Sequence, residues 1–287
     1  TRLVRDAAGR LNCYAHLLHE DAALPPALIA AADGFLAADP VSVTDKPRPP
    51  DGVARNDYVS IARYVHPGPD GHYVFRDGEH NPAAVRGRPE ADAYDRFRLQ
   101  TMIEAVTALA LAQHFTADRR YGDHAVRFVR AWFIDAATRM TPHNRFAQIR
   151  PDRPSELATF GLIDFRDFWA LADALRLLRQ AGSLTEDDET TLVKWFRAFG
   201  DQLVKRTGGG ASMHNNIGVY HDLLVASLAA YTDDRGVLAT ALARACLRVV
   251  VQVRPWGWQE SETGRAAPLH YSLFALQGLT GLAWLGR

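Results

Sequence analysis

The chain has 287 residues, 47% of them hydrophobic, with 33 basic and 33 acidic side chains. This size and apolar content allow one large domain or two small ones, with a substantial core. The balanced charge argues against a nucleic-acid-binding protein, which usually has a basic excess. No apolar run approaches the length of a membrane span, so no membrane partner is expected.

Two features bear on location and redox state. Cys13 and Cys246 are the only cysteines, and their separation gives no metal-ligand spacing and no disulfide framework. A single bridge is possible, but two reduced, buried thiols are expected. The chain begins at Thr1. A periplasmic or secreted location is expected if a leader was removed, and a cytoplasmic one otherwise.

Helical periodicity dominates the chain outside residues 39–92. Residues 1–38 predict short helical stretches, with alanine and leucine concentrated over 22–36. Residues 39–92 are rich in proline and glycine, which predicts irregular structure with at most short strands. Further helices are expected, in chain order, over about 94–115, 121–134, 162–178, 186–206, 216–231, 237–253 and 269–285.

The connections and caps between these helices favour a simple architecture. Ser183 and Glu186 have the spacing of a capping box before the helix that ends near residue 206. Helices joined by short loops favour antiparallel hairpins, wound into a bundle or a toroid. The prediction is an all-α fold in one domain spanning residues 1–287, with the irregular segment contributing to a cleft.

The most distinctive segment is residues 208–222, where three glycines precede two asparagines and two histidines. Asn215 and Asn216 lie where a helix begins, and free backbone N–H groups and the helix dipole favour an anion there. Asparagine is also a preferred N-cap, so both uses are open. His214 and His221 lack the close spacing of a zinc-binding helix, so no metal is predicted.

A second polar cluster follows about fifty residues later. It contains Glu262, Arg265, His270 and Tyr271, placed before and at the start of the last predicted helix. Together the two clusters predict a site that holds a carboxylate and moves a proton beside it.

Several further segments match known signatures in the correct order. Residues 42–47 (SVTDKP), 57–60 (DYVS) and Tyr64 resemble "SVTDKP…DYMSLAPYWWP"; residues 73–78 (YVFRDG) resemble "PYIRRDG"; residues 131–148 resemble "AWFLDPATRMNPNLxxAQ". These are signatures of the alginate-lyase-like family of polysaccharide lyases. The resemblance runs from about residue 40 to the end. It implies an incomplete (α/α) toroid with a substrate cleft, and an enzyme that needs no cofactor.

The resemblance also implies roles for single residues. The family's "NNHG" segment corresponds to residues 215–218, and its "ExxR…HYS" segment to residues 262–272. Asn216 would neutralise a uronate carboxylate, Arg265 would lie beside the catalytic tyrosine or that carboxylate, and Tyr271 would transfer the proton. The residues expected to contact substrate are Asn215, His214, His143, Gln148, Tyr64, His270, Glu262 and Trp258.

Two departures from the family pattern bear on the expected site. Ile217 stands where the family has a histidine, and Val65-His66 replaces a pair of tryptophans. His221, one helical turn after Ile217, and His214 are the candidates to replace the lost imidazole. His221 is therefore counted among the predicted catalytic residues.

The implied reaction is β-elimination on a β-1,4-linked polyuronate, either alginate or glucuronan. A base removes the proton at C5, and the C4–O bond breaks with help from an acid. Tyr271 is expected to act as base and then as acid, with Arg265 lowering its pKa from the usual value of about 10. Donors to the carboxylate stabilise the enolate-like intermediate.

Each site residue also has a structural explanation. Tyr271 fits a core position, the asparagines fit a simple helix cap, and Arg265 fits an ion pair with Glu262. His143 and Gln148 fit a surface loop. The alternatives in function are a small-molecule lyase or dehydratase on the same scaffold, and an inactive carbohydrate-binding protein. The expected partner is an acidic polysaccharide or oligosaccharide; the oligomeric state is not predicted.

Overall fold

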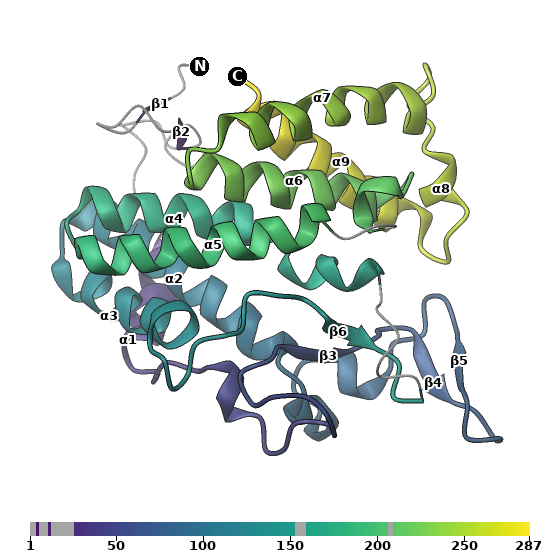
Figure 1. The fold of residues 1–287 in the computed structure, drawn as a ribbon, viewed down its shortest axis with the longest axis horizontal. Helices are drawn as coiled ribbons and strands as arrows, with labels where there is room; N and C mark the ends of the chain where they lie inside the picture. The colour runs from purple at the N-terminus through teal and green to yellow at the C-terminus, as the bar shows by residue number, and fades with distance from the viewer. Residues whose placement is uncertain (1–3, 6–10, 13–25, 153–158, 206–208) are drawn as a thin grey trace.

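The computed structural model describes residues 4–5, 11–12, 26–152, 159–205 and 209–287 (Figure 1). Helices make up most of this part of the chain, which confirms the prediction of a mainly α-helical fold. They are α1 (Pro26–Leu36), α2 (Arg96–Thr116), α3 (Arg119–Val129), α4 (Phe168–Gln180), α5 (Glu186–Lys205), α6 (Asn216–Tyr231), α7 (Arg235–Gln252), α8 (Glu260–Thr263) and α9 (Pro268–Leu285).

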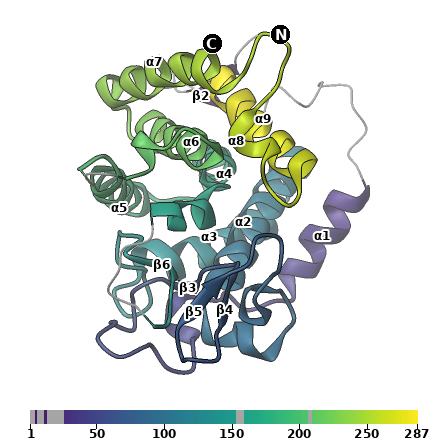
Figure 2. The same ribbon diagram turned by 90° about the vertical axis from the view of Figure 1, so that its right-hand side faces the viewer.

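Helix α6 lies at the centre of the helical part of the molecule. It contacts α4, α5, α7 and α9, and α2 in turn packs against α1, α3 and α4 (Figures 1 and 2). All its residues except Ile217 are buried, as expected for a helix surrounded by others. One hydrophobic cluster of described residues runs from Ala32 to Leu285. None of the described helices is long and apolar enough to cross a membrane.

The short strands within residues 59–149 lie together at the lower right of the molecule in Figure 1. Strand β3 (Val59–Ile61) pairs in parallel with β6 (Phe146–Ile149), and β4 (Val65–Pro67) pairs antiparallel with β5 (Tyr73–Phe75). The prediction that strands occur only within residues 39–92 is therefore wrong for β6. A strand of four residues has too little periodicity to identify in the sequence.

The prediction of helical stretches before residue 38 is correct only in part. Val4–Arg5 (β1) and Leu11–Asn12 (β2) form an antiparallel pair instead. Helix α1 is described from Pro26 onward; residues 22–25 of the predicted helix lie outside the described residues.

Two other local predictions are corrected. Residues 162–178 are not one helix, because a 3₁₀ segment (Thr159–Phe165) precedes α4. The capping box of α5 is formed by Thr185 and Asp188: the Thr185 Oγ1 accepts from the Asp188 N–H (3.1 Å), and the Asp188 carboxylate accepts from the Thr185 N–H (3.2 Å). Ser183 instead shares hydrogen bonds with the Gln113 side chain.

The cysteine prediction is tested at one position. Cys246 is exposed on α7 rather than buried, and it is a free thiol. Cys13 lies outside the described residues.

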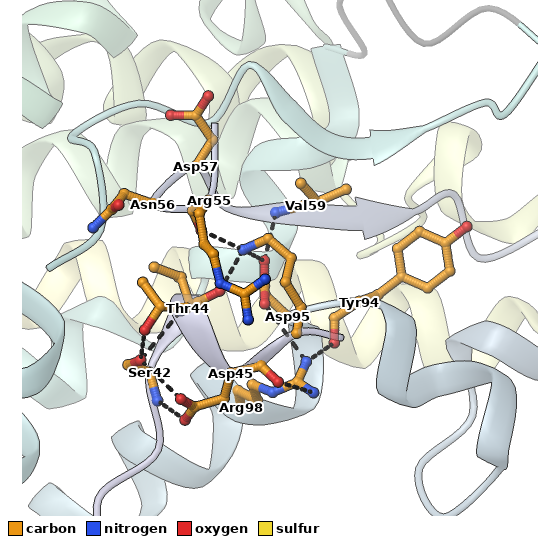
Figure 3. A network of polar contacts seen from close by, with 12 residues as sticks. Ser42, Thr44, Asp45, Arg55, Asn56, Asp57, Val59, Tyr94, Asp95 and Arg98 are labelled. Atoms are coloured by element: carbon orange, nitrogen blue, oxygen red, sulfur yellow. Dashed lines mark hydrogen bonds and ion pairs between the residues drawn. The ribbon is translucent and has the colours of Figure 1, made fainter. Parts of the chain in front are cut away.

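Residues 42–47 anchor the irregular segment to the start of α2 (Figure 3). The Lys46 ammonium is completely buried and lies 3.0 Å from the equally buried Asp95 carboxylate. Lys46 also donates to the carbonyl of Arg55 (2.8 Å), and Asp95 accepts from the Val59 N–H (2.9 Å). A buried pair with these extra hydrogen bonds fixes one arrangement of the chain. This signature motif therefore positions the segment that carries β3 and β4.

Candidate functional site

Tyr271, in the first turn of α9, is held by two side chains that are distant in sequence. Its hydroxyl donates to the Tyr64 hydroxyl (2.6 Å) and accepts from the Arg265 guanidinium (2.9 Å). The Arg265 guanidinium also covers the Tyr271 ring, 3.9 Å from its centroid, a favourable cation–π arrangement. The Tyr271 side chain is nearly buried, but its polar end faces this group rather than the apolar core. The structure therefore brings three of the predicted residues together.

Asp77 fixes the orientation of Arg265. Its two carboxylate oxygens accept from Arg265 Nε (2.9 Å) and Nη2 (2.6 Å), and one also accepts from the Ala266 N–H (3.0 Å). The neighbouring Gly78 has a φ of +82°, and a Cβ there would lie 2.9 Å from the Ala266 Cβ. Glycine is therefore required for this close approach. The expected pair between Arg265 and Glu262 does not form.

These contacts join the β4–β5 hairpin to the connection before α9. Figures 1 and 2 place that hairpin and α8 at the same end of the molecule. The aspartate and glycine come from residues 73–78, one of the signature segments. The sequence motif alone does not reveal the role of Asp77 and Gly78, because it does not show that Arg265 is the partner of Asp77.

The pKa of Tyr271 is shifted upward, whereas the sequence analysis predicted a downward shift. Burial, followed by the hydrogen bond and the charge interaction with Tyr64, raises the pKa of Tyr271 above its usual value. Arg265 acts in the predicted direction and lowers it, but this does not outweigh burial. In the same cluster the Arg265 hydrogen bonds hold the pKa of Asp77 at about 2. The free protein therefore holds a protonated phenol beside an ionised Arg265–Asp77 pair.

The N-terminus of α6 is already filled by an acidic side chain. The Glu262 carboxylate accepts from the Asn216 backbone N–H (2.5 Å) and from its side-chain amide (2.6 Å), and both residues are buried. Burial raises the pKa of Glu262, and the two donors oppose this. Asn215 is the N-cap, accepting from the Ile217 N–H (3.0 Å). The anion favoured at this helix end is thus the protein's own Glu262.

His221 lies in the interior and bonds to its neighbour in sequence. Its Nδ1 is 3.0 Å from the Asp222 carboxylate, which also binds Arg244 and Arg248. Arg248 donates in addition to the carbonyl of Ala211. This group ties α7 to the loop before α6. His221 is therefore a buried member of this group of hydrogen-bonded side chains.

The remaining predicted residues lie in different settings. His214 is exposed, and so is His270, whose ring stacks on Phe274 with centroids 6.1 Å apart. Trp258 is also exposed, on the connection between α7 and α8. His143 Nε2 lies 3.1 Å from Asp57, and burial lowers the pKa of His143.

Gln148 belongs to a buried polar group around Asp164. Its side-chain amide donates to Asp164 (2.9 Å), which also accepts from the Tyr58 hydroxyl (3.0 Å) and from Ser60. The Arg96 guanidinium lies 2.7 Å from the same carboxylate. Gln148 therefore connects β6 to the 3₁₀ segment rather than extending into solvent.

His80 is a residue that the sequence analysis missed. Its ring stacks on the Tyr64 ring, with centroids 5.3 Å apart, and it is exposed beside the Tyr271 group. Burial of the ring, together with Arg63, Arg96 and His270, lowers the pKa of His80. It lies two residues after the "YVFRDG" segment, and only that proximity could have indicated it. No cluster of three metal-ligating side chains occurs among the described residues.

The chain is similar to known proteins over most of its length. A family model described as alginate lyase matches residues 42–287. The chain belongs to the alginate lyase family. A solved structure of an alginate lyase from Bacteroides ovatus is 30% identical, with a TM-score of 0.81; the match covers 91% of this chain and 69% of that one. No curated protein gives a significant match.

Family membership confirms the resemblance and the fold. Members of this family are polysaccharide lyases, and the Tyr64–Arg265–Tyr271 group lies in a chain with that family's fold.

Proposed function

We propose that the protein is a polysaccharide lyase that cleaves a β-1,4-linked polyuronate, alginate or glucuronan, by β-elimination. The observation that carries the proposal is the Tyr271 hydroxyl, held between Arg265 and Tyr64 by hydrogen bonds of 2.9 and 2.6 Å. A phenol held beside a fixed cation can give up a proton and recover it without moving. That is the requirement for one group serving as base and acid.

In the proposed step, Tyr271 first loses its hydroxyl proton to solvent, and the resulting phenolate takes the proton from C5 of the sugar. The electron pair forms the C4=C5 double bond, and the C4–O bond breaks. The phenol then returns the proton to the leaving oxygen, so that the products are an unsaturated uronate end and a free hydroxyl end. Arg265 stabilises the phenolate because its guanidinium lies on both the hydroxyl and the ring.

Asn216 has a supporting role in this proposal. Its amide group is committed to Glu262 in the free protein, and Glu262 lies three residues before Arg265. The Arg265 N–H donates to the Glu262 carbonyl (3.2 Å). Asn216 thus holds the turn that carries Arg265. His221 receives no catalytic role, because its ring is buried in the Asp222 group.

A panel of polyuronates tests the proposal. Each polymer is mixed with the protein, and the ultraviolet absorbance of the conjugated unsaturated uronate is followed. Absorbance should rise with alginate or glucuronan. Binding without absorbance would indicate an inactive carbohydrate-binding protein. Neither binding nor absorbance would favour a small-molecule lyase or dehydratase.

Tyr271→Phe tests the proton-transfer group itself. Loss of a general acid–base residue typically lowers kcat by 10²–10⁴-fold, and polymer binding should remain. Tyr220→Phe is the matched control, since the Tyr220 hydroxyl also bonds to α9, at the Phe274 carbonyl (3.1 Å). That variant should keep its kcat. Ordinary activity in Tyr271→Phe would remove Tyr271 from its role.

A further inference from the structure

Arg63 is a half-buried cation without an ion-pair partner among the residues that the structure describes. It lies between β3 and β4, next to Tyr64, and its carbonyl accepts from the Asn81 N–H (2.8 Å). Within the part of the chain that the structure describes, its guanidinium has no ion pair and no hydrogen bond to a protein acceptor. Burial lowers the pKa of Arg63, and the nearby Arg96 lowers it further. An unpaired cation in such a place is costly unless an anion joins it.

The acidic side chains near Arg63 do not neutralise its positive charge. Asp164 is the nearby acid, but it already lies 2.7 Å from Arg96. It also accepts hydrogen bonds from Tyr58, Ser60 and Gln148. Arg166 pairs with Asp167 (3.3 Å). The region around Arg63 therefore has one more positive charge than it has acids to neutralise.

Arg96 gives a second, independent indication of a missing anion. Its side chain is 3% exposed, and its Nε and Nη1 have no hydrogen-bond partner among the described residues. Arg63 and Arg96 both act on the ring of His80, which stacks on Tyr64. Both cations thus influence the ring that stacks on Tyr64, and the Tyr64 hydroxyl accepts from the Tyr271 hydroxyl.

Position 63 is also one where the chain departs from its family signature. The signature "DYMSLAPYWWP" has proline where this chain has Arg63, and "NNHG" has histidine where this chain has Ile217. The chain has lost one group able to carry positive charge and gained another. The α6 N-terminus, where a substrate carboxylate was expected, is occupied by Glu262.

We propose that Arg63 is the residue that binds the carboxylate of the uronate at the cleavage position, in place of the missing histidine. The inference rests on the proposed function. A guanidinium offers two parallel N–H donors to a carboxylate. In this proposal the sugar acid lies beside the Tyr64–Tyr271 pair, because Arg63 directly precedes Tyr64 in the chain and Tyr64 is bonded to Tyr271. Its charge is neutralised where the enolate-like intermediate forms.

The test compares Arg63→Gln with a matched control, Arg76→Gln. Arg76 lies on the same hairpin region, but its guanidinium is exposed and pairs with Glu79 (3.4 Å). Both variants remove one positive charge. For Arg63→Gln, kcat/KM on the polyuronate that the wild type cleaves should fall by about 10²–10³-fold, as for loss of one oxyanion donor. Arg76→Gln should stay within about twofold of the wild type, in line with a weak exposed pair.

Direct binding separates carboxylate recognition from a structural effect. Calorimetric titration with oligomers of the cleaved uronate should show weaker binding to Arg63→Gln, and titration with the carboxyl-reduced oligomers should show no difference from the wild type. Arg63→Lys should recover part of the loss, since the charge remains but the bidentate fork is absent. The thermal midpoint of Arg63→Gln should equal or exceed that of the wild type, because an unpaired buried charge is removed.

A double variant tests the replacement itself. Ile217→His added to Arg63→Gln should restore activity at least tenfold over Arg63→Gln alone, and Ile217→His added to Arg76→Gln should not raise it. If the wild type cleaves a polyuronate and Arg63→Gln matches it in kcat/KM and binding, the inference is wrong and the proposed function stands. If the wild type cleaves no polyuronate, the proposed function fails, and this inference with it.

Discussion

Two of the ion pairs that join residues 39–92 to the rest of the described chain differ sharply in burial. Lys46 and Asp95 lie 3.0 Å apart with both side chains 0% exposed, whereas Arg265 and Asp77 lie 2.6 Å apart with side chains 28% and 26% exposed. Burial raises the pKa of Asp95 to about 6, and hydrogen bonds from Arg265 lower the pKa of Asp77 to about 2. The pKa of an aspartate carboxyl is thus raised in the buried pair and lowered in the partly exposed pair.

The difference in burial distinguishes a pair that stabilises the fold from a pair that orients a site residue, although both involve residues of the signature motifs. Lys46 and Asp95 bond to each other and to backbone groups, and both side chains are 0% exposed, so the pair fixes the chain and lies out of reach of a ligand. Arg265 keeps a donor for Tyr271 while Asp77 fixes its plane. A motif shared by a family therefore need not lie in its active site. The partly exposed pair is the one placed to influence chemistry.

The largest effect is expected at the buried pair. Lys46→Met leaves the Asp95 carboxylate buried without its partner, which should lower the free energy of unfolding by about 3–5 kcal/mol. Urea unfolding followed by circular dichroism measures this. Adding Asp95→Asn, which keeps an oxygen for the Val59 N–H, should recover most of the loss. A single variant as stable as the wild type would contradict the structural role of this pair.

Arg265→Gln should have the next largest effect, on catalysis rather than folding. Losing the charge that favours the Tyr271 phenolate should lower kcat by about 10²-fold, comparable to loss of one preorganised donor. The control is Arg254→Gln, in the connection before α8, whose exposed guanidinium pairs with Glu260 (2.9 Å). Equal losses in both variants would show that net charge, not the contact with Tyr271, is responsible.

Tyr64→Phe should move the pH dependence of the reaction. Because the pKa of Tyr271 is raised, the phenolate fraction and kcat/KM should still be increasing at pH 9–10. Tyr64 contributes to that raised pKa, so its loss should shift the rise to lower pH. Tyr73→Phe, on the same hairpin, should leave the profile in place. If the rise in kcat/KM moved to higher pH in Tyr64→Phe, Tyr64 would not be a cause of the raised pKa of Tyr271.

Asp77→Asn should show the smallest effect, in acid stability. A carboxyl whose folded-state pKa is below its unfolded value of about 3.8 stabilises the fold above that pH, and the contribution is lost as the pH falls towards 2. The difference in thermal midpoint between wild type and variant should be full at pH 6 and should shrink from pH 4 downward. A difference that is constant over pH 3–6 would exclude this linkage.

The sequence by itself determined most of the helices. Long stretches rich in helix-forming apolar residues, 21 residues in α2 and 16 in α6, indicate these helices, because a helix preference sustained over many residues outweighs local variation. The ordered motifs indicated the family, and within it Tyr64, Arg265 and Tyr271, which the structure brings into contact. Short elements such as β6, and the choice between Ser183 and Thr185 as a cap, were not determined, since several nearby residues satisfy the same local pattern.

Only the tertiary structure decided which charges meet. Arg265 pairs with Asp77, 188 positions away, rather than with Glu262 three positions away. Glu262 in turn occupies the helix end that a substrate acid was expected to fill. Burial, a property of the packed molecule, reversed the expected pKa shift of Tyr271, and packing left Arg63 without an ion-pair partner in the described part of the chain. Residue types and spacing record which groups are present, whereas their proton affinities and partners depend on the dielectric and the distances that packing creates.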